Sequence, residues 1–150
     1  MTDSTLKVQI TEDMKAAMRA KDMARLGTIR MLLAAMKQKE VDERVVLTNA
    51  DILVILNKMI KQRRESATQF RDAGRLELAE KEEQEIVQLT EYLPEQLSDN
   101  ELDKMIQDAI ELAAAKTVKE MSAVMAIIKP KAQGRTDMAK VSEKIKEKLR

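Results

Sequence analysis

Apolar residues recur every three or four positions along almost the whole chain, which is the spacing of a helix with one buried face. The first such run places its apolar residues four apart, at Leu6, Ile10, Met14 and Met18. The second run carries Leu26, Ile29, Leu33 and Met36. The third carries Ile52, Ile55, Leu56, Met59 and Ile60. The pattern predicts helices that pack these faces into a common core.

Capping signals predict where the third helix begins and ends. Thr48, with Asp51 three residues later, has the capping-box pattern, and Gly74 can adopt the left-handed conformation that ends a helix. These signals predict a helix over residues 48–73. A fourth helix is expected over residues 75–92, with its inward face formed by Leu76, Ala79, Ile86 and Leu89.

The stretch "YLPEQLSDNEL", residues 92–102, interrupts the helical pattern. Pro94 cannot continue a helix interior and biases the residue before it away from helix, while Ser98 with Glu101 forms a new capping-box pattern. A domain boundary is therefore expected between Leu93 and Ser98. It divides the chain into an N-terminal helical domain, residues 1–95, and a small C-terminal domain, residues 96–150.

Three short helices are predicted beyond this boundary. The apolar face of the first consists of Leu102, Met105, Ile106 and Ala109. The second is expected to begin at Thr117, boxed with Glu120, and to end at Pro130 and Gly134; its apolar face is Met121, Val124, Met125 and Ile128. The third carries Met138, Val141, Ile145 and Leu149. The predicted fold class is all-α, with about four helices in the first domain and a three-helix second domain.

The composition fits an almost entirely helical protein. Gly and Pro number three and two, and charged residues make up 35% of the chain. One Phe and one Tyr supply the only aromatic volume, so that Leu, Ile, Val, Ala and the eleven Met residues must fill the core.

The chain has no Cys and no His, which excludes thiol catalysis, disulfides, Cys/His zinc sites and imidazole acid–base chemistry. No catalytic residue, metal site or cofactor is predicted. No apolar run approaches the roughly 18 residues of a membrane span, and no apolar signal core is seen near residue 1. A cytoplasmic protein without membrane contact is therefore expected.

The net charge of +1 conceals three charged blocks. Residues 129–150 hold eight Lys/Arg and three Asp/Glu, a net charge of +5. Residues 58–75 carry +4, from six basic and two acidic residues, and residues 75–91 carry −4, from two basic and six acidic residues. The charge of each segment is therefore a better guide to possible binding surfaces than the net charge of the whole chain.

The basic C-terminal block has two interpretations. Lys129, Lys131 and Arg135 flank a turn, and a lysine row follows along one face of the last helix at Lys140, Lys144 and Lys148. Such cations suit phosphate contacts, and the amides that begin the last helix are a further place for a phosphate. The alternative is an ordinary solvated helix face. The candidate nucleic-acid-binding residues are Lys129, Lys131, Arg135, Lys140 and Lys144.

The two central blocks also have two interpretations. Antiparallel packing about Gly74 places basic residues of one helix, Arg63, Arg64 and Arg71, near acidic residues of the next, Glu80, Glu83 and Glu85. Salt bridges across this hairpin are favoured over an anion site, because the opposite charges are already supplied within it. The acidic run Glu80–Glu85 is interpreted as a solvated face rather than a catalytic carboxylate pair.

Three segments resemble the GatB/YqeY family, and specifically its stand-alone YqeY-like proteins. They are "RLGTIRMLLAAMKQKEVDER" (25–44), "IKQRRESATQFRDAGRLELAEKEEQEIVQLTEYLPEQLSDNEL" (60–102) and "MSAVMAIIKPKAQGRTDMAKVSEKIKEKL" (121–149). The middle segment is the most distinctive, through its AGR turn and its YLP-x-Q-L.

The resemblance implies an all-helical protein whose C-terminal half is similar to the tail of the B subunit of glutamyl/aspartyl-tRNA amidotransferase. That tail contacts the body of the tRNA, so the resemblance implies tRNA-facing roles for Lys129, Lys131, Arg135 and Lys140. The family label is carbon–nitrogen ligase with glutamine as amido-N-donor, yet no residues here form a site for that chemistry.

Three functional hypotheses follow. The first is a non-catalytic accessory module that binds tRNA or tRNA-like RNA. The second is a protein-interaction module that docks on an amidotransferase or an aminoacyl-tRNA synthetase without touching RNA. Catalysis by the chain itself ranks last, because the sequence offers no catalytic constellation.

Overall fold

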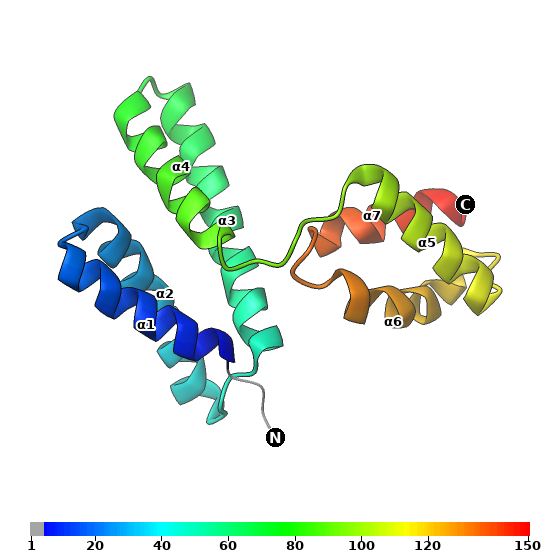
Figure 1. Cartoon of the computed structure of the whole chain (residues 1–150). Coiled ribbons are helices and arrows are strands. Elements are labelled where there is room, and N and C mark those ends of the chain that lie inside the picture. Colours follow the sequence, from blue (N-terminus) through cyan, green and yellow to red (C-terminus); the bar gives the residue numbers. More distant parts are fainter. Residues whose placement is uncertain (1–4) are drawn as a thin grey trace. The chain divides into compact units, whose positions relative to one another are not determined.

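The computed structural model describes residues 5–150, and its regular structure is helical throughout this range, which confirms the predicted all-α class (Figure 1). The chain divides into two compact units, Met1–Leu93 and Pro94–Arg150. The first contains α1 (Thr5–Ala20), α2 (Met23–Glu43), α3 (Asn49–Asp72) and α4 (Leu76–Thr90). The second contains α5 (Asp99–Ala113), a 3₁₀ turn (Val118–Glu120), α6 (Met121–Ala132) and α7 (Met138–Lys148). The predicted domains, residues 1–95 and 96–150, stay a prediction.

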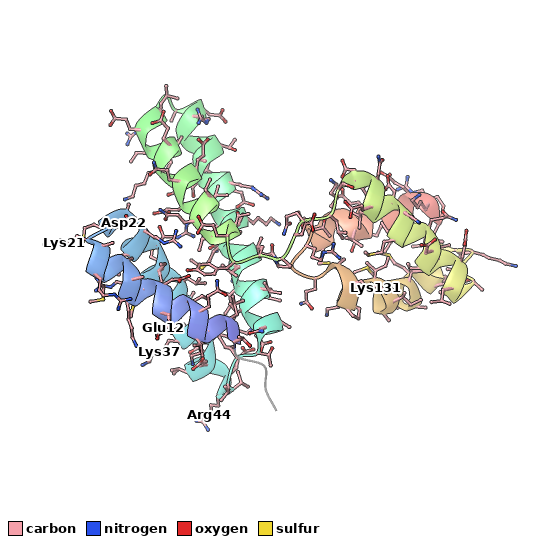
Figure 2. All side chains as sticks on the ribbon, viewed as in Figure 1. Glu12, Lys21, Asp22, Lys37, Arg44 and Lys131 are labelled. Atoms are coloured by element: carbon pink, nitrogen blue, oxygen red, sulfur yellow. The ribbon has the colours of Figure 1, made fainter. Side chains whose placement is uncertain are left out.

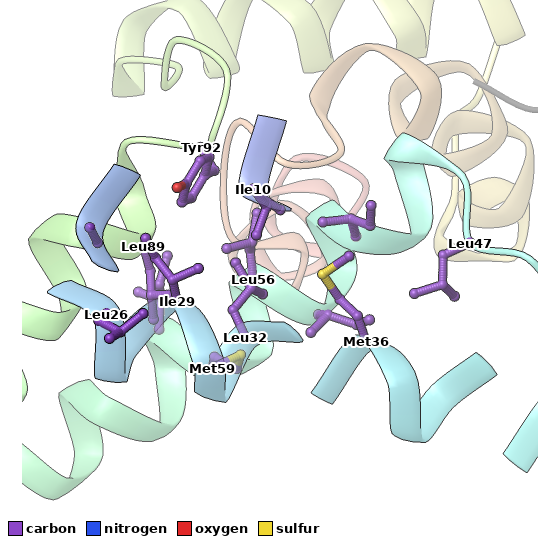
Figure 3. Packing of buried hydrophobic residues seen from close by; sticks show 14 residues of the cluster. Ile10, Leu26, Ile29, Leu32, Met36, Leu47, Leu56, Met59, Leu89 and Tyr92 are labelled. Atoms are coloured by element: carbon purple, nitrogen blue, oxygen red, sulfur yellow. The ribbon is translucent and has the colours of Figure 1, made fainter. Parts of the chain in front are cut away.

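The first unit consists of two helical hairpins, α1–α2 and α3–α4, around one aliphatic core (Figure 1). Figure 3 shows this core, whose labelled members are Ile10, Leu26, Ile29, Leu32, Met36, Leu47, Leu56, Met59, Leu89 and Tyr92. Tyr92 is the only aromatic residue in it, and its hydroxyl donates a 2.7 Å hydrogen bond to Asp13 Oδ2 of α1.

The predicted caps of α3 are confirmed. Thr48 Oγ1 accepts from the Asp51 amide at 3.2 Å, and Asp51 Oδ2 accepts from the Thr48 amide at 2.9 Å. This second bond stabilises the charged carboxylate and lowers the pKa of Asp51. At the other end, Gly74 has φ of +74°, a conformation that costs little without a Cβ.

The prediction that Met18 and Leu76 lie on buried apolar faces is wrong. Met18 is exposed, and Ala17 takes its place in the core of α1. Three successive steps of four residues rotate a side chain by about 120° around a helix of 3.6 residues per turn, so a strict spacing of four leaves the buried face. Leu76, the first residue of α4, is also exposed.

The second unit is a three-helix bundle with its own core, as predicted. Its fully buried members include Leu102, Ile106, Val124, Ile128, Val141 and Ile145. The Ser98–Glu101 capping box forms at the start of α5. Just before it, the Leu97 amide donates to the Arg135 carbonyl at 2.9 Å, and Gln96 Nε2 donates to the Gly134 carbonyl at 2.9 Å. The segment preceding α5 is thereby attached to the α6–α7 turn.

Two predictions for α6 are wrong. The Thr117 side chain makes no capping bond, since the Glu120 amide donates to the Thr117 carbonyl at 3.1 Å, and Glu120 Oε2 accepts from the Lys116 amide at 2.8 Å. The helix α6 begins at Met121. Pro130 lies inside the last turn and does not end the helix. Pro130 has no amide hydrogen to donate, but the helix continues past it to Ala132, and the Gln133 amide donates to the Lys129 carbonyl at 3.0 Å. The helix ends before Gly134, which has φ of +82°.

The core of the second unit can be tested with one substitution at two sites on α5. Leu102 is 1% exposed and Leu112 is 75% exposed. We expect Leu102→Ala to lower the free energy of unfolding by about 2–5 kcal/mol, through lost burial and the cavity left behind. Leu112→Ala should change it by less than about 0.5 kcal/mol. Urea denaturation followed by circular dichroism measures both, and equal effects would contradict the assigned core.

Candidate nucleic-acid interface

The five predicted cations lie on three elements of the second unit. Lys129 and Lys131 are in the last turn of α6, Arg135 is in the α6–α7 turn, and Lys140 and Lys144 are on α7. The structure does not bring them together as one set of free charges, although their assignment as RNA-binding residues stays a prediction.

The two lysines of α7 are paired with carboxylates of α5. Lys144 Nζ lies 2.7 Å from Asp103 Oδ1, and Lys140 Nζ forms an ion pair with Asp99 Oδ1. The hydrogen bond from Lys140 lowers the pKa of Asp99, and the hydrogen bond to Asp103 raises the pKa of Lys144. The two pairs are four residues apart on both α5 and α7, and they reduce the positive charge that α7 offers to a polyanion.

The two lysines of α6 lie on different sides of their helix. Residues two apart are separated by about 200° around a helix axis. Lys131 lines a groove between α5 and α6, whereas Lys129 does not (Figure 2 labels Lys131). Lys129 therefore lies on the side of α6 away from this groove.

Backbone carbonyls hold the Arg135 side chain. Its Nε donates to the Glu95 carbonyl at 3.0 Å, and its Nη1 lies 3.5 Å from the Lys131 carbonyl. These acceptors orient the guanidinium without neutralising it, so Arg135 keeps a positive charge at the end of the groove.

The groove between α5 and α6 has a volume of about 350 Å³. Its apolar lining consists of Leu97, Met105, Ala109, Leu112 and Ile127. Its rim carries three cations and two carboxylates, Lys104, Lys131, Arg135, Glu101 and Asp108. None of the three cations forms an ion pair within residues 5–150.

Lys104 is the member of this cluster that the sequence analysis missed. It lies on α5 beside the core residue Met105, in a segment of mixed charge that gave no signal of its own. Only the packing of α5 against α6 brings it near Lys131.

The start of α7 is already occupied by a carboxylate. Asp137 caps the helix, and its Oδ1 accepts from the Ala139 amide at 3.0 Å. The predicted phosphate position at this helix end therefore faces a negative side chain.

The central hairpin confirms the salt-bridge interpretation. Arg63 Nε lies 3.0 Å from Glu85 Oε2, and Arg71 Nη2 lies 2.6 Å from Glu83 Oε1. Arg71 and Glu83 share three hydrogen bonds, and these raise the pKa of Arg71. Both arginines are thus paired with glutamates of the same hairpin.

Residues 5–150 contain no cluster of three or more acidic side chains placed to hold a metal ion. Within the same range, no helix combines the length and the hydropathy that crossing a bilayer requires.

A family model described as "Yqey-like protein" matches residues 7–149, which is nearly the whole chain. The chain belongs to the YqeY-like protein family. This confirms the resemblance found in the sequence.

The YqeY-like chain is similar to several fungal proteins. It is 37% identical over 95 residues to a protein of Schizosaccharomyces pombe that is named as uncharacterized, covering 63% of this chain and 74% of that one. It is 40% identical over 85 residues to the "Altered inheritance of mitochondria protein 41, mitochondrial" of Eremothecium gossypii, covering 56% and 46%. For the protein of the same name from Pyrenophora tritici-repentis, the identity is 29% over 142 residues, covering 93% and 78%.

These names correct the expectation of a cytoplasmic protein. Relatives from Eremothecium gossypii, Vanderwaltozyma polyspora and Pyrenophora tritici-repentis are all named as mitochondrial proteins. The expectation rested on the absence of an apolar signal core, and that absence does not distinguish the cytoplasm from other locations inside a cell.

The Asp99–Lys140 pair predicts a dependence of stability on acid. A carboxylate whose pKa is lowered by folding contributes stability above its unfolded pKa, and loses it as the pH falls through the folded value. We expect the free energy of unfolding of the parent to fall more steeply than that of Asp99→Asn between about pH 5 and about pH 2. Denaturant titrations across this range measure the difference. Asp108→Asn, at a site on α5 without an ion pair, is the control and should keep the parental slope.

The hairpin provides a second test through two double-mutant cycles. Arg63 and Glu85 have side chains only 12% and 13% exposed, so their attraction is weakly screened. We expect a coupling free energy of about 1–3 kcal/mol between them. The exposed Arg71–Glu83 pair should couple more weakly despite its additional hydrogen bonds. Stability measurements on single and double alanine variants give both values, and the reverse order would contradict the assigned burial.

Proposed function

We propose that this YqeY-like chain is a non-catalytic accessory protein that binds tRNA or tRNA-like RNA along the α5–α6 groove of its second unit. The observation that carries the proposal is the gathering of Lys104, Lys131 and Arg135 around one groove, without ion pairs to carboxylates in residues 5–150. The resemblance to the tRNA-contacting tail of an amidotransferase subunit supports the choice of ligand.

Phosphate contacts are the interactions that such a cluster offers. Lys104 and Lys131 can act as mobile point charges, whereas the carbonyls of Glu95 and Lys131 hold the Arg135 guanidinium in place. Each neutralised phosphate releases counterions, so binding should weaken steeply as salt rises. Glu101 and Asp108 on the same rim oppose a polyanion and keep the affinity modest.

This assignment changes the set of contact residues. Lys131 and Arg135 remain central and Lys104 joins them, whereas Lys129 lies on the other side of α6. Lys140 and Lys144 are placed outside the contact set, because Asp99 and Asp103 already pair with them.

Any carbon–nitrogen ligase reaction would be carried by a partner. The chain has no Cys or His, and its hairpin arginines are engaged in salt bridges. The role proposed for the YqeY-like chain is to hold the RNA.

A second candidate function is docking on an amidotransferase or an aminoacyl-tRNA synthetase without RNA contact. It is favoured by the apolar side chains that line the same groove, among which Leu112 is largely exposed. Exposed aliphatic side chains beside a pocket are typical of surfaces that bind proteins.

Two double variants with the same loss of charge test the RNA proposal. Lys104→Ala with Lys131→Ala should weaken the binding of total tRNA at least about tenfold at low salt, and should reduce the slope of log K against log salt by about two. Lys140→Ala with Lys144→Ala should have a much smaller effect, because those lysines are already paired. Electrophoretic shifts across a salt series measure both.

If the two double variants lost the same tRNA affinity, binding would depend only on the net charge of the protein, and the assigned site would be wrong. No binding of tRNA by the parent at low salt, together with a synthetase or amidotransferase component captured after nuclease treatment, would favour the docking function instead.

A further inference from the structure

The motif YLP-x-Q-L, residues 92–97, contains a polar side chain that the proposed function does not use, that of Gln96. Gln96 Nε2 donates two hydrogen bonds, to the Pro94 carbonyl at 3.0 Å and to the Gly134 carbonyl at 2.9 Å. A side-chain amide has one nitrogen donor group, so backbone carbonyls take up the whole donor capacity of this residue. Gln96 therefore bridges the segment that precedes α5 and the α6–α7 turn.

The peptide group that joins Gly134 to Arg135 is held at both of its polar atoms. Its carbonyl accepts from Gln96, and its amide, which belongs to Arg135, donates to the Ala132 carbonyl at 2.9 Å. The Arg135 carbonyl in turn accepts from the Leu97 amide at 2.9 Å. These bonds fix the backbone from which the Arg135 side chain extends.

The guanidinium of Arg135 is held at one edge and free at the other. Its Nε donates to the Glu95 carbonyl at 3.0 Å, and its Nη1 lies 3.5 Å from the Lys131 carbonyl. Its Nη2 forms no hydrogen bond within residues 5–150. A planar cation with one fixed edge and one free edge is suited to donate parallel hydrogen bonds to a phosphate.

We propose that Gln96 is a positioning residue for the α5–α6 groove, because its bridge to Gly134 holds the turn from which Arg135 presents its free edge to a phosphate. This inference rests on the proposed function, since the phosphate is that of the bound RNA. Gln96 does not line the groove itself, so it acts through Arg135. By limiting the conformations of that side chain before RNA binds, it lowers the entropy that binding costs.

A double-mutant cycle in the full chain tests whether Gln96 acts through Arg135. Gln96→Ala should weaken the binding of total tRNA at low salt by about two- to tenfold, the loss expected for one orienting hydrogen bond. In an Arg135→Ala background the same substitution should have no further effect, because no guanidinium is left to position. Gln107→Ala is the matched control on α5, where the amide bonds to Glu111 of the same helix, and it should leave the tRNA affinity unchanged.

Hydrogen exchange at the Arg135 Nε–H group tests the positioning without RNA. In NMR spectra of the full chain, this group should exchange slowly in the parent, because it donates to the Glu95 carbonyl. Gln96→Ala should speed the exchange at least about threefold, and Gln107→Ala should leave it at the parental rate. Circular dichroism of each variant verifies the fold.

Three results would overturn the proposal. They are an Arg135 Nε–H exchange rate that Gln96→Ala leaves unchanged, a tRNA affinity that it leaves unchanged, and an affinity that falls equally with and without Arg135. The last result would mean that Gln96 supports the fold rather than the guanidinium. A parent that binds no tRNA would contradict the proposed function, and the exchange rates would still decide whether Gln96 positions Arg135.

Discussion

Burial of narrow aliphatic faces holds this protein together, since neither a sheet within residues 5–150 nor a disulfide shares the task. Each unit has its own cluster of Leu, Ile, Val, Met and Ala side chains, supplied by every one of its α-helices. Because Tyr92 is the only aromatic residue in these clusters, small and flexible aliphatic side chains fill most of the space between the helices. The second unit depends on this most, because a bundle of three short helices buries little surface to offset the entropy of folding.

In both units, some charged residues form ion pairs between helices and others stay unpaired. In the first unit, Arg63 and Arg71 of α3 are neutralised by Glu85 and Glu83 of α4. In the second, α5 pairs Asp99 and Asp103 with α7 and turns Lys104 toward α6. One helix therefore pairs two cations with carboxylates while adding a third, unpaired cation to the groove. This redistribution, rather than the net charge of the tail, decides which of these cations are left without an ion pair.

Local features could be predicted from the sequence, whereas features that depend on packing could not. The caps at Thr48 and Ser98 and the turn at Gly74 follow from residues a few positions apart, and they formed as expected. Thr117 has the same local pattern, but Glu120 found the Lys116 amide instead. The pairs Lys140–Asp99 and Lys144–Asp103 each join residues 41 apart. Finding them, and finding Lys104 beside Lys131, requires the relative placement of α5, α6 and α7, which helical periodicity alone does not contain. Met18 shows a further limit, because a regular spacing of four gradually rotates off the buried face.

The short stretch ahead of α5 has a consequence for how the second unit is delimited. Gln96 and Leu97 are hydrogen-bonded to Gly134 and Arg135, and the Glu95 carbonyl accepts from the guanidinium. The helical core starts only at Ser98, yet the peptide groups before it orient a charged side chain more than thirty positions away in the sequence. A fragment cut at the helix boundary would lose Leu97, which packs against the hydrophobic core, together with the carbonyl that orients the Arg135 guanidinium. The ends of this module are therefore set by these hydrogen bonds as well as by where its helices start.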